Sequence, residues 1–266
     1  MPTVVSQDGT PIAYMAGDTG GQAVVLVGGG LDAGEENAGL IDELPGWTAA
    51  TYARRGRGES GDSQPYAVER EIEDIAALIE ELGGTAHLFG ASSGGALALA
   101  AAAAGLPVQK VAVYEVPYMT DEPMVAGWAT YRAHLATALE DGRRGDAVAL
   151  FMALAGASEA DIAGARASEY WQPLEALAHT LAYDAACLGD GRVPTEMLAR
   201  IGNPVLVATG AAADPVMGGL QPGFFDDAAD ALVAALPRAE RAVIPLSGHQ
   251  VDPAALAPVL EEFFER

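Results

Sequence analysis

Short apolar runs separated by glycine-rich turns dominate the first third of the chain. The runs at 3–6 and 12–16 flank an Asp-Gly turn, a pattern that predicts a two-stranded hairpin. Residues 23–27 are continuously apolar and stop at three glycines, which is typical of a strand buried on both faces. A further strand is expected at 47–52.

The pattern then changes to a helical period. Apolar residues recur at every third or fourth position from Ile72 to Leu82 and stop at a Gly-Gly pair, which predicts a helix. A strand at 86–89, an alanine-rich helix at 96–104 and a strand at 108–114 are expected next. Because strand, helix and strand at short spacing imply parallel pairing, the prediction is an α/β fold with a mostly parallel central sheet flanked by helices.

Residues 117–200 carry no β-type run, and their apolar side chains recur at helical spacing. This segment is interpreted as a helical cap inserted into the fold. Strands are expected again at 204–209 and 239–246, with a helix between them. A last helix is expected to begin with Asp252 as its N-cap, followed by a proline. The prediction is one domain over 1–266, interrupted by the cap.

Composition narrows the classes of partner. Half of the 266 residues are hydrophobic, the formal charge is -23, and Lys110 is the only lysine. Such a surface repels nucleic acid and anionic lipid, so neither a nucleic-acid nor a membrane partner is expected. No apolar stretch is long enough for a membrane span, and the first residues lack a signal-peptide pattern. The single cysteine, Cys187, excludes an intrachain disulfide, so a cytoplasmic protein is expected.

The segment Gly90-Ala91-Ser92-Ser93-Gly94 fits the pattern G-x-S-x-G between a predicted strand and a predicted helix. That context is the one a nucleophile elbow requires, where a sharp turn exposes the serine hydroxyl at the positive end of a helix. Small residues around the serine suit the crowding of such a turn. Ser92 is therefore predicted to be a catalytic nucleophile; the alternative is a glycine-rich turn with an idle serine.

Together with the elbow, the segments at 24–30 and 54–60 resemble the α/β-hydrolase superfamily, and the likeness extends over essentially the whole chain. The chain is most similar to small bacterial hydrolases with a helical cap. The resemblance implies an α/β-hydrolase fold. Members commonly carry an acidic residue just before the arginine-rich loop, where this chain has Ala53. That departure is expected to affect a loop contact rather than the chemistry.

The resemblance also implies an oxyanion hole, in which backbone amides meet the negative charge that develops during acyl transfer. One donor is the amide of Ser93, the residue after the nucleophile. The other comes from the loop after residue 27, where many members read His-Gly-x and this chain reads three glycines. Gly30 is the first choice for this donor, and Leu31 is the next.

A serine needs a general base, and the chain has four histidines. His249 lies in the loop between the last predicted strand and the last helix, where the fold delivers its base. His87 opens a predicted core strand and is interpreted as structural. His134 and His179 lie in the predicted cap and could line the pocket.

The acid that orients the imidazole has two candidates. Asp214 follows the strand predicted at 204–209, the usual position in the order Ser, Asp, His, and is the first choice. Glu115 ends the strand predicted at 108–114 and is the rival. The sequence position of Asp252 beside His249 is explained by helix capping.

The substrate is expected to bind between the cap and the sheet. Trp128, Tyr131 and Trp171 of the cap are predicted to line the pocket with Leu31, which suits an apolar, aromatic or polyketide-like small molecule. No metal-ligand spacing, phosphate loop or dinucleotide fingerprint is present, so no metal or cofactor is expected. The oligomeric state stays open, a homodimer included.

The predicted activity is hydrolysis of a carboxylic ester, thioester or lactone through an acyl-enzyme on Ser92. One alternative keeps the fold and changes the reaction to acyl transfer, carbon–carbon bond cleavage, elimination or cyclisation in secondary metabolism. Another is a receptor that binds a ligand without turning it over. A fold alone does not choose among these activities.

Overall fold

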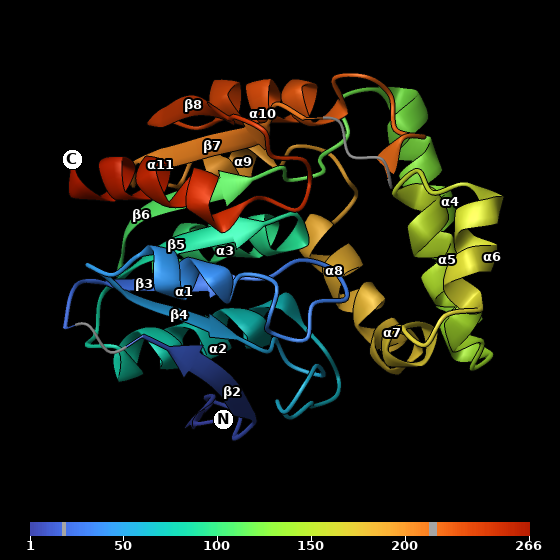
Figure 1. Cartoon of the computed structure of the whole chain (residues 1–266), viewed down its shortest axis with the longest axis horizontal. Helices are drawn as coiled ribbons and strands as arrows, with labels where there is room; N and C mark the ends of the chain where they lie inside the picture. The colour runs from blue at the N-terminus through green and yellow to red at the C-terminus, as the bar shows by residue number, and fades with distance from the viewer. Residues whose placement is uncertain (18–19, 213–216) are drawn as a thin grey trace.

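The computed structural model describes residues 1–17, 20–212 and 217–266. Its centre is an eight-stranded sheet in the order β1-β2-β4-β3-β5-β6-β7-β8 (Figure 1). The pairs β1–β2 and β2–β4 are antiparallel, and all others are parallel. The strands are β1 Thr3–Val5, β2 Pro11–Ala16, β3 Ala23–Val27, β4 Thr48–Tyr52, β5 Ala86–Ala91, β6 Val108–Tyr114, β7 Val205–Gly210 and β8 Ala239–Ile244.

Helices cover both faces of the sheet, and the alternating side chains of each central strand serve both layers. In β3, Val25 and Val27 pack in a cluster with α2 (Val68–Glu81), α3 (Ser93–Ala103) and α10 (Phe224–Ala235). Val24 and Leu26 pack on the other face with α1 (Gly39–Glu43) and α11 (Pro253–Glu265). Successive strand residues point to opposite faces, which explains why this strand is apolar at every position.

The segment between β6 and β7 is helical and stands beyond the end of the sheet (Figure 1). We call the helices α4 to α8 the helical wall. Helix α8 packs against α3, and α4 packs against α5. The elements of this segment are α4 Glu122–Glu140, α5 Arg144–Leu154, α6 Glu159–Arg166, α7 Trp171–Leu177, the 3-10 turn η1 Ala178–Thr180, α8 Leu181–Leu188 and α9 Thr195–Leu198.

Aspartates begin two helices, one of them the predicted N-cap Asp252. The Asp252 carboxylate accepts the Ala254 amide at 3.0 Å, which makes it the N-cap of α11. Asp121 caps α4 in the same way through the amide of Met124. These contacts satisfy amides that a helix leaves without intrahelical acceptors.

The predicted α/β architecture with a mostly parallel sheet is confirmed. One difference in bounds lies at the elbow, where β5 continues to Ala91 and α3 already begins at Ser93. Strand and helix thus meet at a single residue, which a periodicity count over alanines does not reveal. Across the described part of the chain, no helix combines the length and apolar character that crossing a membrane requires.

Candidate active site

Ser92 is the one residue between β5 and α3, and its backbone is strained. Its φ is 53° and its ψ is -128°, a conformation that a side-chain-bearing residue rarely adopts. The neighbouring chain is packed tightly around it. A Cβ added to Gly90 would lie 2.5 Å from the Gly94 carbonyl oxygen, and one added to Gly94 would overlap the Val27 carbonyl. Glycine is therefore required on both sides for the turn to form.

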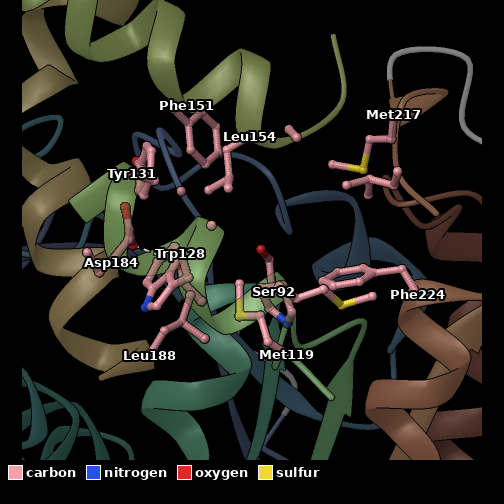
Figure 2. Close-up of a pocket in the computed structure, with 18 of the residues that line it drawn as sticks. Ser92, Met119, Trp128, Tyr131, Phe151, Leu154, Asp184, Leu188, Met217 and Phe224 are labelled. Atoms are coloured by element: carbon pink, nitrogen blue, oxygen red, sulfur yellow. Dashed lines mark hydrogen bonds between the residues drawn. The ribbon is translucent and has the colours of Figure 1, made fainter. Parts of the chain in front are cut away.

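Ser92 opens into a cavity of about 290 Å³ between the sheet and the helical wall. The sheet side contributes Gly30, Ser92, Ser93 and His249. Most of the other lining residues are apolar and come from α4, α5, α8 and the segment before α10. Figure 2 shows Trp128, Tyr131 and Phe151 on one side of Ser92, and Met217 and Phe224 on the other.

His249 is held by a carboxylate at the end of β6, the strand that pairs with β5. Its Nδ1 lies 2.8 Å from Oε2 of Glu115, which directly follows β6. The other Glu115 oxygen, Oε1, accepts the Gly210 amide at 2.9 Å, and the Glu115 residue is only 6% exposed. The Phe225 ring stacks on the imidazole, with centroids 4.9 Å apart. Because a carboxylate only accepts, Nδ1 carries the proton of this contact and Nε2 is left as the basic nitrogen.

Asp214, the first choice for the acid, lies outside the described residues. The rival, Glu115, is the carboxylate found on His249. No hydrogen bond joins the Ser92 hydroxyl to His249 in the described residues, although both line the same cavity. Such contacts between nucleophile and base often shorten only when substrate binds.

Two successive glycines of the loop after β3 differ in their surroundings. The Gly29 amide donates to Oε2 of Glu36 at 3.0 Å, so it is engaged within the protein. Gly30 and Ser93 both line the cavity beside Ser92. Ser93 is the first residue of α3, and amides in the first turn of a helix have no intrahelical acceptor. The assignment of these two amides to an oxyanion hole stays a prediction.

A neighbouring side chain explains why position 28 is a glycine. A Cβ added there would overlap the carboxylate of Asp32. That carboxylate accepts the amides of Gly34, Glu35 and Glu36 and so folds the loop. The chain thus stabilises this loop with an aspartate side chain and leaves no room for a side chain at Gly28.

Of the residues predicted to bind substrate, two line the cavity and two do not. Trp128 and Tyr131 line the cavity. Leu31 does not line it and packs against the apolar core. Trp171 is also outside the lining, because its ring is buried against the guanidinium of Arg166, 4.9 Å away. An aromatic residue in a helical segment can pack the segment itself, and the sequence pattern does not distinguish the two roles.

The remaining histidines lie elsewhere. His87 is 1% exposed, its Nε2 is 2.9 Å from Gln22 Oε1, and burial lowers its pKa to about 4. These contacts confirm its structural role. His134 is exposed on α4, and His179 lies between Asp62 and Arg144. Neither lines the cavity, which differs from the role that the sequence left open for them.

Residues that the sequence did not single out complete the lining, Phe151, Asp184, Phe224 and Phe225 among them. A signal for Asp184 is present in the sequence. Positions 181, 184, 185 and 188 of α8 share one helix face, which is apolar except at Asp184. A charged residue on an otherwise apolar face indicates either a buried ion pair or a ligand contact.

Asp184 takes part in a buried network of charges. Its Oδ1 accepts hydrogen bonds from Arg54 and Arg57, each at 2.7 Å, and from the Ser93 hydroxyl at 2.8 Å. Arg54 also pairs with Glu71 at 2.7 Å. All five of these side chains are buried. The arginine-rich loop after β4 is thereby tied to the residue that follows the nucleophile.

The protonation state of Asp184 follows from these contacts. Burial alone raises the pKa of its carboxyl group, but the guanidinium groups of Arg57 and Arg54 outweigh burial and lower the pKa below its usual value. The side chain is therefore a carboxylate at neutral pH. Among the described residues, no group of three or more histidine, cysteine, aspartate or glutamate side chains is arranged to hold a metal ion.

Comparisons with known proteins agree with this fold. The model of the alpha/beta hydrolase family matches residues 21–260. An AB hydrolase superfamily protein of Gibberella zeae is 33% identical over 97 residues, which cover 35% of this chain and 34% of that protein. The chain therefore aligns with about a third of the length of this curated relative.

Solved structures match over nearly the whole chain. An alpha/beta hydrolase from Sphaerobacter thermophilus is 43% identical, with a TM-score of 0.86 and coverage of 99% of this chain and 100% of that one. A thermophilic esterase from Thermogutta terrifontis shares the fold at 20% identity, with a TM-score of 0.70 and coverage of 99% and 97%. Because the family model spans most of its length, this chain belongs to the alpha/beta hydrolase family.

Proposed function

We propose that the protein is a serine hydrolase that cleaves a carboxylic ester, thioester or lactone of a compact, largely apolar small molecule. The observation that carries this proposal is the strained Ser92 at the strand–helix turn, in one cavity with a histidine that a buried carboxylate holds. A nucleophile, a base and an orienting acid are the three groups that acyl transfer needs.

In the proposed mechanism, Ser92 Oγ attacks the substrate carbonyl while His249 Nε2 takes the hydroxyl proton. The amides of Gly30 and Ser93 stabilise the oxyanion of the tetrahedral intermediate. His249 then gives the proton to the leaving oxygen or sulfur, and water repeats the sequence to release the acid. We propose Glu115 as the acid in place of Asp214, because its carboxylate lies 2.8 Å from Nδ1 of His249.

The cavity limits the substrate. Its volume of about 290 Å³ is at the lower end of small-molecule sites. Its aromatic lining from Trp128, Tyr131, Phe151 and Phe224 favours an apolar or aromatic acyl group over a polar one. Long-chain lipids do not fit such a volume without movement of the helical wall.

The test is hydrolysis of methyl and phenyl esters of graded acyl size by the purified protein. We expect turnover of short and aryl-substituted acyl esters, and a loss of at least about 10⁴-fold in kcat/KM for Ser92→Ala. Ser168→Ala, which changes an exposed serine outside the cavity, is the matched control and should retain full activity. Undiminished hydrolysis by a folded Ser92→Ala variant would refute the proposed mechanism.

A further inference from the structure

A carboxylate oxygen of a cavity-lining residue has no hydrogen-bond partner in the described part of the chain. Oδ1 of Asp184 accepts from Arg54, Arg57 and Ser93, whereas its Oδ2 has no hydrogen-bond partner among the described residues. Asp184 is only 5% exposed and lines the cavity. Figure 2 shows it beside Trp128 and Tyr131, across Ser92 from Met217 and Phe224. A buried acceptor without a partner is costly, which points to a donor that the bound ligand supplies.

The unpaired oxygen lies beside the proposed oxyanion site. A Cβ built on Gly30 would be 3.5 Å from Asp184 Oδ2 and 3.2 Å from Cζ of Phe151. A carbonyl oxygen bound at the amides of Gly30 and Ser93 therefore has Oδ2 as a close neighbour. Atoms on the first or second carbon from that carbonyl are within reach of it.

The surrounding charges indicate a neutral donor. Two guanidinium groups lie 2.7 Å from the Asp184 carboxylate, and the Glu71 carboxylate lies 2.7 Å from one of them. Two positive and two negative side chains thus offset one another, so the network offers no excess negative charge to a cationic ligand. An ionised carboxylate can only accept, which leaves a hydroxyl as the simplest partner for Oδ2.

We propose that Asp184 Oδ2 accepts a hydrogen bond from a hydroxyl group on the acyl part of the substrate, at the first or second carbon from the carbonyl. The proposal rests on the proposed function, because that function places the carbonyl at Gly30 and Ser93. An ester without the hydroxyl covers Oδ2 and leaves it unpaired, so it binds less well. The preferred substrates are hydroxy esters or hydroxy lactones.

The test measures binding to the Ser92→Ala protein by titration calorimetry, so that turnover does not interfere. One ligand pair is methyl mandelate and methyl 2-phenylpropanoate, which differ by hydroxyl against methyl on the first carbon. The other is methyl 3-hydroxy-3-phenylpropanoate and methyl 3-phenylbutanoate, which differ in the same way on the second carbon. We expect the hydroxylated member of at least one pair to bind about tenfold tighter or more. Equal or weaker binding of both hydroxylated esters would overturn the proposal.

Two further variants in the same background assign the preference to Oδ2. In Asp184→Leu no hydrogen-bonding group of residue 184 faces the cavity, so the preference for hydroxyl over methyl disappears. Gly30→Ala leaves the ion pairs intact and crowds Oδ2 with a methyl group, and Gly30 has an ordinary φ that alanine can adopt. Persistence of the preference in Gly30→Ala or in folded Asp184→Leu would overturn the assignment.

Asp74→Asn is the matched control. Asp74 is a fully buried carboxylate paired with Arg55 at 2.7 Å, and it lies outside the cavity. Its variant should show the same hydroxyl preference as the parent, whatever its effect on stability. A wild-type protein that hydrolyses no ester but keeps the hydroxyl preference would refute the hydrolase proposal alone. Hydrolysis without any hydroxyl preference would refute only the role of Asp184.

Discussion

Glu115, which contacts His249 on the sheet side, and Asp184, which lines the cavity from the helical wall, differ in how their carboxylate oxygens are used. Both oxygens of Glu115 are engaged, one by the Gly210 amide and one by His249. Within the described residues, only one oxygen of Asp184 is engaged, and it accepts from three donors. Full pairing fixes a side chain in one orientation, whereas a free lone pair is available to a ligand. We therefore propose that Glu115 positions the base and that Asp184 recognises the substrate.

The same division holds for the two sides of the cavity as a whole. Ser92, Gly30 and Ser93 follow the ends of parallel strands, so the hydrogen-bonded sheet fixes their relative positions. The helical wall contributes mainly large apolar side chains that shape the space. We therefore expect changes on the sheet side to affect the chemical step, and changes on the wall to affect the choice of substrate.

The largest expected effect comes from removing the base. His249→Ala should lower kcat by about 10⁴-fold or more, because the Ser92 hydroxyl then has no group to take its proton. Steady-state kinetics on a phenyl ester measures the loss. His134→Ala, an exposed histidine of the wall, should leave kcat unchanged. Near-normal activity of His249→Ala would contradict the proposal that His249 is the general base.

The next effect sharpens the assignment of the acid. Glu115→Gln should lower kcat by about 10²- to 10⁴-fold, since the amide cannot stabilise the imidazolium as a carboxylate does. Asp214→Asn should change kcat much less, because Glu115 is the carboxylate on Nδ1 of His249. The two variants are compared at one pH with the same ester. The reverse ranking would return the acid to Asp214.

A third expectation concerns His87, the buried histidine of the sheet. Burial lowers the pKa of His87 from 6.5 to about 4, so the folded state resists a proton that the unfolded chain accepts. Stability is therefore lost as the pH falls from about 6.5 to about 4, by on the order of 2 to 3 kcal/mol. His87→Phe should flatten this part of the profile in urea unfolding at each pH, and His134→Ala should not. An unchanged slope in His87→Phe would contradict the neutral buried imidazole.

The smallest effect is expected from the helical wall. Phe151→Ala enlarges the cavity and should shift kcat/KM between small and bulky acyl esters by about tenfold. Its rate of reaction with a small serine-directed phosphonate should stay within about twofold of wild type, as the sheet side is intact. Leu150→Ala truncates a neighbour on α5 that does not line this cavity and serves as the control. A large loss of phosphonate reactivity in Phe151→Ala would break the division between the two sides.

The sequence predicts the sheet side better than the helical wall. A strand–serine–helix turn is a local pattern, and the loop before the last helix marks His249 by its position in the fold. The acid is different, because Glu115 and Asp214 follow two neighbouring parallel strands, β6 and β7. Sequence alone does not show which of two such carboxylates reaches an imidazole from a third segment.

The sequence predicts that the wall is helical, but it identifies only some of the side chains that line the cavity, Trp128 and Tyr131 among them. Helical spacing gives the apolar face of each helix and not what that face contacts. Trp171 packs under Arg166, whereas Phe151 lines the cavity, and both are aromatic residues on short helices. Asp184 was missed because its significance depends on Arg54 and Arg57, which are about 130 residues away along the chain.

The most direct test of the central claim is labelling of the purified protein with a fluorophosphonate, followed by mass spectrometry of its peptides. A serine activated by a base reacts with such a probe, whereas an ordinary serine does not. The account predicts one adduct, on Ser92, that is lost in His249→Ala and kept in His134→Ala. An adduct on another residue, or equal labelling of Ser92 without His249, would contradict it.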